Sequence, residues 1–461
     1  MLKWDDLLCS KRRRDLNCET AENSNPLSTG GSRTEIERDY DRILFAAPTR
    51  RLADKTQVFP LEPNDSIRTR LTHSHEVSNL ARSIGTKLVY EHYDSVFGDT
   101  DKDMVVRDVP AMLAAVALAH DLGNPPFGHQ GEVAMKQWFE EKCNANGECD
   151  RYKDFTVFDG NAQTFRLVTK LQVLTDDYGL NLTCGTLAAL LKYPSLHDFS
   201  GYGGYKKFGV FESERQAVKQ VWDATGLQQG VRHPLAYIME ACDDIAYSVL
   251  DTEDIVNKGY ASYNDLISYL KNESDNDPVV KDLVENVEVK CQDFPRSNLS
   301  SDELNNLSMQ MFRVRAIYVL VEETTKTFVE NVSKMLDGTA ESGGELLDMT
   351  TTCTLWKLLK SFSRKHGFNH TDILRLELEG NNLIKSTMDM LWEAISKEDR
   401  NTFEKFAFQR ISENYRRIYE KSEKKLYNQY QLLADSVSGM TDSYLKQIHS
   451  ELRPLYNGYR S

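Results

Sequence analysis

The sequence has no Cys-x-x-Cys pair, although it contains eight cysteines among its 461 residues. They are scattered at Cys9, Cys18, Cys143, Cys149, Cys184, Cys242, Cys291 and Cys353. Without closely spaced thiols, the pattern argues against a thiolate metal site and against the disulfide framework of a small secreted domain. A chain of this length can bury a sizeable core and needs neither device in order to fold.

Long apolar runs are also missing. The longest, residues 109–119, is about half of the roughly 20 residues that a membrane-spanning helix requires. The first residues, Met1-Leu2-Lys3-Trp4-Asp5-Asp6, contain no apolar core of the kind that a signal peptide needs. We therefore expect a cytoplasmic protein with no membrane partner.

Positive charge is scarce relative to negative charge. The chain has 56 Lys and Arg against 70 Asp and Glu, which gives a formal net charge of −14. This balance argues against a protein whose main role is to wrap nucleic acid, but it leaves room for a small basic pocket that binds an anion. The basic run Lys11-Arg12-Arg13-Arg14 lies in a polar stretch, residues 9–34, which we interpret as a solvated surface arm. Residues 1–34 are accordingly assigned to an N-terminal arm.

Alternating strand patterns are scarce as well, and from Glu35 onward apolar residues recur at helical spacing. Ile36, Tyr40, Ile43 and Leu44 form one apolar stripe, whereas residues 109–120 are apolar on nearly every side and predict a buried central helix. Further helices are predicted over 66–94, 161–178, 183–192, 212–225, 234–258, 303–336, 352–365, 382–396 and 401–433. The predicted fold class is all-α.

Two polar segments interrupt the helical pattern. Residues 140–153 and 272–301 are rich in charged and amide side chains, and we predict insertions or weakly ordered loops there. The second segment separates a front half with many motifs from a back half with few. We therefore assign residues 35–265 to a core domain and residues 266–461 to a C-terminal helical region.

Histidines and carboxylates concentrate in the front half. Five of the ten histidines lie within residues 73–129, and His120-Asp121 ends the predicted apolar helix. Two ionisable groups at that position are costly unless they are paired or bind a metal. Imidazole nitrogen and carboxylate oxygen together suit a divalent ion, so His73, His120, Asp121 and Asp243 are candidate ligands. The alternative is a set of histidines that are simply hydrogen-bonded in the core.

The segment after Asp121 predicts a rigid turn, because residues 122–128 include two glycines and two prolines. Such a turn presents His129 at a fixed distance from the metal ligands. Glu132 follows one helical turn later and can orient the imidazole for proton transfer. From spacing alone, a helix–turn–helix connector with an incidental histidine is an equal alternative.

A later helix carries Asp243, Tyr247 and Asp251 at positions i, i+4 and i+8, so all three lie on one face. A solvated acidic face with a packed tyrosine is the alternative. The apolar neighbours Ile245 and Val249 indicate that the helix is largely buried, which weakens that alternative.

These motifs together resemble known enzymes. The segment 70–73 (RLTH), followed by His120-Asp121 and a late aspartate, resembles the HD-domain metal-dependent phosphohydrolases. Longer strings are more specific and resemble the bacterial dGTP triphosphohydrolases. They are residues 55–61 (KTQVFPL), 120–129 (HDLGNPPFGH), 160–166 (GNAQTFR), 239–247 (MEACDDIAY) and 438–442 (SGMTD). The resemblance covers about residues 35–445 and is weakest over 265–430.

The resemblance implies an HD-domain helical fold with a C-terminal helical elaboration. It also implies hydrolysis of a dNTP, with dGTP preferred, to deoxynucleoside and inorganic triphosphate by attack of metal-activated water at the α-phosphorus. The ligands of Mg²⁺ or Mn²⁺, with Co²⁺, Fe²⁺ or Zn²⁺ as alternatives, would be His73, His120, Asp121 and Asp243. His129 would protonate the leaving 5′ oxygen with support from Glu132.

Substrate-binding roles follow from the same resemblance. Arg70, Lys192 and Lys207 would hold the triphosphate, while Tyr247 and Asp251 would contact the deoxyribose and exclude ribonucleotides. The whole set of implied substrate-binding residues is Gln57, Arg70, Asn161, Lys192, Tyr193, Lys207, Tyr247 and Asp251.

Two other functions stay open at this level. One is another HD-type nucleotide phosphohydrolase or phosphodiesterase, against which the strings around 120–132 and 160–166 count. The other is a nucleotide-sensing regulatory protein, for instance in phage defence, against which the intact ligand set counts. The resemblance also implies a homo-oligomer, commonly a hexamer, and single-stranded nucleic acid or a nucleotide as an effector. His75 departs from the family pattern, and we interpret it as a polar side chain facing solvent.

Overall fold

The computed structural model describes residues 1–16, 32–60, 67–147, 149–172, 176–292, 299–340, 344–423 and 425–460. Over these residues the chain forms twenty-two α-helices and no β-strand, with two isolated β-bridges, Arg12 to Thr183 and Thr56 to Thr69. The prediction of an all-α fold is therefore confirmed. None of the helices in the described ranges combines the length and the hydropathy needed to cross a membrane.

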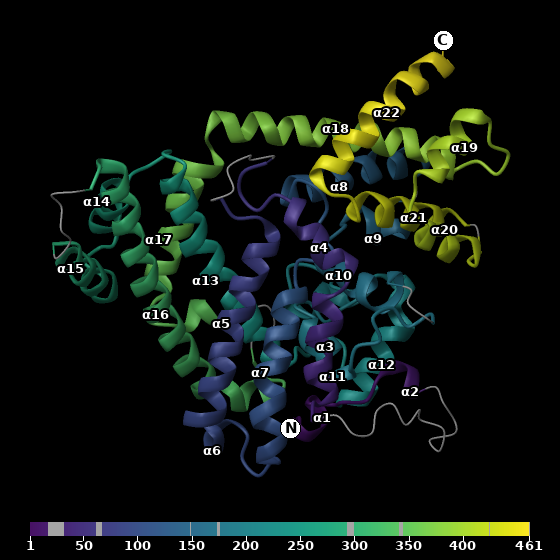
Figure 1. The fold of residues 1–461 in the computed structure, drawn as a ribbon. Coiled ribbons are helices and arrows are strands. Elements are labelled where there is room, and N and C mark those ends of the chain that lie inside the picture. The colour runs from purple at the N-terminus through teal and green to yellow at the C-terminus, as the bar shows by residue number, and fades with distance from the viewer. Residues whose placement is uncertain are drawn as a thin grey trace.

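Four helices build the centre of the molecule: α3 (Glu35–Leu44), α5 (Arg70–Glu91), α7 (Lys102–Ala119) and α13 (Pro234–Asn257). α7 is apolar nearly all round, as predicted, and lies between α3 and α5 (Figure 1). Gly85 lets α5 and α7 approach closely, because a Cβ atom there would lie 2.8 Å from Leu113 Cδ1. Capping boxes begin α3 at Thr34 and α5 at Thr69, which fixes where each helix starts.

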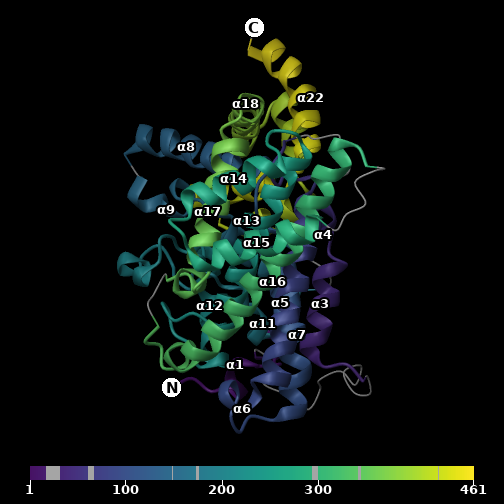
Figure 2. The same ribbon diagram turned by 90° about the vertical axis from the view of Figure 1, so that its left-hand side faces the viewer.

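The C-terminal helices cover this centre on two sides. The long helix α16 (Ser301–Leu336) and α17 (Cys353–Ser363) pack against α13, while α18 (Thr371–Ile395) crosses α8 (Gly128–Asn146). α21 (Leu426–Ser438) and α22 (Asp442–Arg460) lie against α18, and both views place them at the end of the molecule opposite α6 (Figures 1 and 2). The remaining α-helices are α1 (Trp4–Leu7), α2 (Arg13–Leu16), α4 (Ala47–Arg51), α6 (Tyr93–Val96), α9 (Lys153–Thr156), α10 (Gly160–Arg166), α11 (Cys184–Leu190), α12 (Arg215–Thr225), α14 (Tyr263–Glu273), α15 (Pro278–Gln292), α19 (Thr402–Gln409) and α20 (Glu413–Glu420). The division at residue 265 stays a prediction.

The interpretation of the basic run as solvated is wrong at Arg12. Its side chain is only 4 % exposed and donates hydrogen bonds to Asp39 Oδ1 at 2.8 Å and to Glu35 Oε2 at 2.9 Å. Trp4 of α1 is buried as well, so the first sixteen residues pack against the core. A buried guanidinium is tolerated here because two carboxylates compensate its charge. Residues 17–31 of the expected arm lie outside the described residues.

The prediction of a weakly ordered loop over residues 272–301 is wrong over α15. This helix buries Val280, Leu283, Val284 and Val287 at helical spacing, and its polar residues lie between them. The high polar content of the segment concealed this narrow apolar stripe. Likewise, α8 extends through Asn146, into the segment 140–153 that we expected to be a loop.

His233 makes the stability of the fold depend on pH. It caps α13, with Nδ1 accepting from Leu235 N at 3.1 Å and Nε2 donating to Leu7 O at 3.2 Å. Burial lowers the pKa of His233 to about 4. Between its ordinary value near 6.5 and about 4, the unfolded chain therefore binds a proton that the folded chain does not, so stability is lost as the pH falls through this window.

Acid should accordingly destabilise the wild type more than the variant His233→Asn. Asparagine keeps a capping oxygen but does not titrate. Between pH 7 and pH 4.5, the wild type should lose about 2 kcal/mol more free energy of unfolding than the variant, as urea unfolding can measure. An identical pH dependence in the two proteins would show that another group is responsible.

Candidate active site

Three helices meet at a cluster of imidazole and carboxylate groups. His73 lies in the first turn of α5, His120 follows the last residue of α7, and Asp243 lies on α13. Ligand atoms of these three residues all lie within 4.8 Å of one another. Asp243 Oδ1 is 3.1 Å from His73 Nε2 and 3.4 Å from His120 Nε2. The structure therefore brings three of the four predicted metal ligands to one point.

The hydrogen bonds of the two imidazoles leave nitrogen atoms available to a ligand. His120 Nδ1 lies 2.6 Å from Ala117 O, and since a carbonyl oxygen only accepts, Nδ1 carries the proton. In the neutral ring His120 Nε2 then has a free lone pair, and among the described residues it has no hydrogen-bond partner. His73 faces the same carboxylate through Nε2, which lies 3.1 Å from Asp243 Oδ1. Two imidazole nitrogens that converge on one carboxylate fit a divalent metal.

The pKa shifts within the cluster also favour a bound cation. Burial lowers the pKa of His120, but Asp121 and Asp243 outweigh this effect and raise it to about 9. Burial raises the pKa of Asp243, yet the charge of His120 and the hydrogen bond from His73 hold it well below its ordinary value. Without another cation, an imidazole proton must balance the carboxylates. A divalent ion would provide that charge instead and would displace the proton.

Asp121 sits at the edge of the cluster. Its Oδ1 is 3.5 Å from His120 Nε2 but also accepts a hydrogen bond from Asn124 Nδ2 at 2.6 Å. Its Oδ2 accepts from the guanidinium of Arg70, the first residue of α5. Arg70 and Asn124 thus orient this carboxylate. Sequence reasoning missed the role of Asn124, although the residue lies inside the glycine- and proline-rich string.

The turn after Asp121 delivers His129 to the start of α8. Phe127 and Gly128 both have left-handed backbone conformations, with φ of 58° and 57°. Position 128 favours glycine because of this positive φ, and a Cβ atom there would also lie 2.4 Å from Arg70 Nη2. The turn therefore both packs against Arg70 and begins the helix that carries His129.

His129 is exposed, whereas the carboxylate beside it is buried. The His129 side chain is 75 % exposed, and its Nδ1 is 3.5 Å from Glu132 Oε2. Glu132 is buried, and its Oε1 accepts from Gly160 N at 2.8 Å. The backbone of α10 therefore fixes the carboxylate, which in turn can orient an imidazole that a substrate can reach. This is the geometry of a histidine that transfers protons.

The two candidate phosphate-binding lysines are each paired with a buried carboxylate. Lys192 Nζ is 3.5 Å from Glu240 Oε1, and Lys207 Nζ donates to Asp159 Oδ2. Asp159 also accepts from Asn161 Nδ2 at 2.7 Å, which places Asn161 beside Lys207. Sequence reasoning missed Glu240 and Asp159. The available signal for Glu240 was an acidic residue inside the otherwise apolar start of α13.

Tyr247 and Asp251 follow Asp243 along α13. The Tyr247 ring stacks against Phe368, with ring centroids 5.8 Å apart and planes 7° apart. Asp251 is fully buried, and neither of its carboxyl oxygens has a hydrogen-bond partner among the described residues. Burial raises the pKa of Asp251 well above its ordinary value, which favours the protonated form of this carboxyl group. No local pattern indicated Phe368, which lies in the region of weakest resemblance.

The remaining residues that the sequence analysis singled out are Gln57, Tyr193 and His75. Gln57 Oε1 is buried and has no hydrogen-bond partner among the described residues, like the carboxyl oxygens of Asp251. The Tyr193 ring packs edge-on against Tyr205 at 6.1 Å. His75 is exposed and lines a surface hollow together with residues of α3 and α7, away from the imidazole cluster. Orphaned buried polar atoms such as those of Gln57 and Asp251 are costly unless a ligand completes their hydrogen bonds.

No protein-family model matches the chain. Curated proteins match over nearly its whole length. A deoxyguanosinetriphosphate triphosphohydrolase-like protein of Listeria monocytogenes is 33 % identical, over 98 % of this chain and 100 % of that protein. A protein of the same description from Synechocystis sp. is 29 % identical, over 98 % and 99 %. The deoxyguanosinetriphosphate triphosphohydrolase of Yersinia pestis is 30 % identical, over 89 % of this chain and 92 % of that protein.

Proposed function

The chain belongs to the family of deoxyguanosinetriphosphate triphosphohydrolase-like proteins, and on this premise we propose that it hydrolyses a dNTP to deoxynucleoside and inorganic triphosphate, with dGTP preferred. The observation that carries the proposal is the meeting of His73, His120 and Asp243 at one point, followed in the chain by a turn that presents an exposed His129. We extend the ligand set to Asp121, whose carboxylate borders that point.

His73, His120, Asp121 and Asp243 would hold the metal, Mg²⁺ or Mn²⁺, with Co²⁺, Fe²⁺ and Zn²⁺ as alternatives. Such an ion supplies charge neutralisation and activates a water for attack at the α-phosphorus. His129 then protonates the departing 5′ oxygen, because an alkoxide is a poor leaving group and needs a proton donor. Glu132, fixed by the backbone at Gly160, orients the imidazole for this transfer.

Arg70, Lys192 and Lys207 would bind the triphosphate, which carries about four negative charges. Each cation is paired with a carboxylate: Arg70 with Asp121, Lys192 with Glu240, and Lys207 with Asp159. These pairings hold the three side chains in place before substrate arrives, so little ordering remains to be done on binding. Three cations placed in this way are compatible with the net charge of −14.

We propose that Tyr247 and Asp251 bind the deoxyribose, with Gln57, Asn161 and Tyr193 around the sugar and base. In its protonated form, the Asp251 carboxyl group can both donate to and accept from a sugar hydroxyl. Because Phe368 backs the Tyr247 ring, the ring cannot easily retreat from a 2′ hydroxyl.

Tyr247→Ala should therefore relax the discrimination against ribonucleotides. The ratio of kcat/KM for dGTP to that for GTP should fall by roughly tenfold or more, mainly through improved use of GTP. Steady-state kinetics with both nucleotides measure this ratio. Tyr269→Ala is the comparison, because its ring packs against Phe362 and has no proposed role in substrate binding. An unchanged ratio in Tyr247→Ala would remove this residue from sugar recognition.

Incubation with each dNTP and Mg²⁺ or Mn²⁺, followed by ion-exchange separation of the products, tests the proposed reaction. We expect deoxynucleoside and triphosphate, with dGTP consumed fastest. Pyrophosphate or monophosphate would favour the alternative, another HD-type phosphohydrolase. Tight binding of nucleotide without turnover would favour a regulatory protein.

We further propose a cytoplasmic homo-oligomer, a hexamer by family resemblance, in which residues 266–461 complete the pocket and form the interface around a core of residues 35–265. Single-stranded nucleic acid or a nucleotide is the proposed effector. Analytical ultracentrifugation with and without dGTP or an oligonucleotide tests both points.

A further inference from the structure

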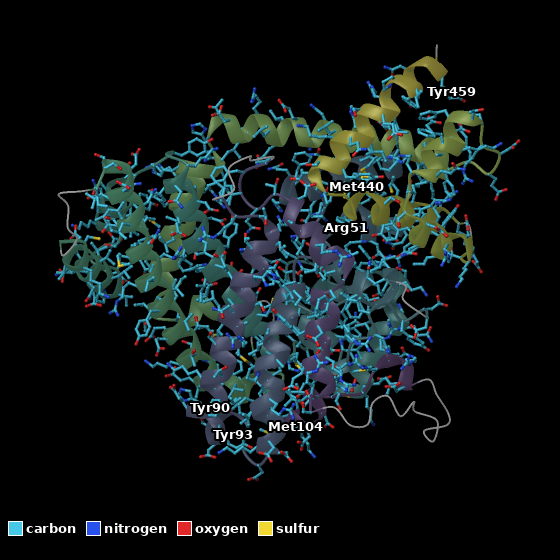
Figure 3. All side chains as sticks on the ribbon, in the orientation of Figure 1. Arg51, Tyr90, Tyr93, Met104, Met440 and Tyr459 are labelled. Atoms are coloured by element: carbon cyan, nitrogen blue, oxygen red, sulfur yellow. The ribbon has the colours of Figure 1, made fainter. Side chains whose placement is uncertain are left out.

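Two short segments, neither of which holds a predicted metal ligand or proton donor, meet beside the turn that leads into α8. These are the segment that contains Lys55 and Thr56 and the segment that joins α21 to α22. Figure 3 places the labelled Arg51 and Met440 close together at this junction, where Arg51 Nη1 donates to Gly439 O at 3.2 Å. The two segments are nearly four hundred residues apart in the chain, so only the tertiary fold brings them together.

Asp442, the first residue of α22, is the centre of the junction. Its side chain is 2 % exposed. Oδ2 accepts from Thr56 N at 3.0 Å and from the Thr56 hydroxyl, while Oδ1 accepts from Phe127 N at 2.9 Å. One buried carboxylate thus connects the segment at Thr56 to the turn before His129.

Lys55 makes a second connection to the same turn. The side chain is 3 % exposed, and Nζ donates to Asn124 O at 2.5 Å and to Ser438 O at 2.8 Å. Lys55 therefore connects Asn124, near the start of the turn, to Ser438, while Asp442 binds Phe127 near the end of the turn. Asn124 in turn orients the carboxylate of Asp121.

Phe127 needs such support because its φ of 58° is unfavourable for a residue with a side chain. The Phe127 ring is also held in place, by a contact with α18. A Cβ atom at Gly380 of α18 would lie 2.6 Å from Phe127 Cγ, so the ring packs directly on the helix backbone there. Two C-terminal helices, α18 and α22, therefore fix a strained residue that lies only two positions before His129.

We propose that Asp442, together with Lys55, is a positioning residue for catalysis. Asp442 holds Phe127 in the left-handed conformation, and this conformation sets the positions of His129 and Asp121 relative to each other. This inference rests on the proposed function for the identity of the reaction. It assigns to the C-terminal helices of the same chain a direct part in building the catalytic turn. Misplacement of a reacting group by about 1 Å can cost roughly 100-fold in rate, so a small shift of the turn is sufficient to matter.

The first test is Asp442→Asn, which retains the size of the side chain but loses one acceptor. With dGTP and Mn²⁺, kcat should fall by roughly 10- to 100-fold while KM changes by less than about threefold. The matched control is Asp39→Asn. Asp39 is also fully buried and accepts from the N–H of a threonine at 2.9 Å and from its hydroxyl at 2.7 Å, but it lies far from the turn in sequence and contacts Thr183. This control should melt at a lower temperature and keep its kcat within about twofold.

The second test perturbs Phe127 from its other side. Gly380→Ala pushes against the ring without touching Asp442 and should also lower kcat more than KM. Hydrogen exchange of the Phe127 amide gives a readout that needs no substrate, and exchange should quicken in Asp442→Asn but not in Asp39→Asn. The proposal is overturned if Asp442→Asn is folded with wild-type kcat and wild-type protection, or if Asp39→Asn loses kcat equally. If the wild type does not hydrolyse dGTP, the proposed function fails, while the exchange data still decide whether Asp442 holds the turn.

Discussion

His129→Ala is expected to lower kcat for dGTP by about 1000-fold, because it removes the proton donor for the 5′ oxygen. His129 is the one member of the site with a mostly exposed side chain, 75 % accessible, and it lies outside the cluster of His73, His120 and Asp243. Removing its imidazole should therefore neither empty a buried cavity nor take away a metal ligand. Turnover is measured by release of triphosphate, and metal binding by titration with Mn²⁺.

Two comparisons make this expectation specific. His75→Ala removes an exposed imidazole from α5 that faces a surface hollow, and it should leave kcat unchanged. Glu132→Gln keeps the acceptor for Gly160 N but loses the charge that favours the imidazolium, so it should lower kcat less than His129→Ala does. Loss of Mn²⁺ binding in His129→Ala would mean that the residue is a ligand rather than an acid.

Local patterns in the sequence were sufficient to predict most helices, because helix formation is read from apolar spacing and capping residues over short distances. α7 and α13 follow directly from their apolar periodicity. The errors have two causes. Arg12 is buried because Asp39 and the chain around Thr183 lie against it, and such tertiary partners are not visible in a short window of sequence. The apolar stripe of α15 is local, but the polar residues around it concealed it.

Some residues of the candidate site could be predicted from the sequence, and others could not. The metal-ligand candidates lie in short strings whose residue types indicate their chemistry, so they could be proposed from the sequence. The groups that hold the site in place could not. Glu240 and Asp159 pair with Lys192 and Lys207, and Asp442 reaches the catalytic turn from the far end of the chain. Their roles depend on which side chain lies opposite, and that is a property of the fold.

Asp243→Asn is expected to have the largest effect on metal binding. Asp243 Oδ1 is the atom that lies within 3.4 Å of both His73 Nε2 and His120 Nε2, so it is the common point of the cluster. The substitution preserves volume but removes the negative charge. Mn²⁺ affinity should fall by more than about 100-fold. Turnover should fall by about 1000-fold or more, since the metal that would activate water is lost.

Asp244→Asn is the matched control, because it changes the adjacent carboxylate on the same helix. Asp244 is 3.4 Å from Lys360 Nζ, and burial raises its pKa to about 7 despite the opposing effect of Lys192. It is not part of the imidazole cluster and should retain Mn²⁺ binding. Bound metal also raises the melting temperature of a protein that binds it only when folded. Mn²⁺ should therefore stabilise the wild type and Asp244→Asn but not Asp243→Asn. Equal stabilisation of all three proteins would place the metal elsewhere and would leave the convergence of His73, His120 and Asp243 without an explanation.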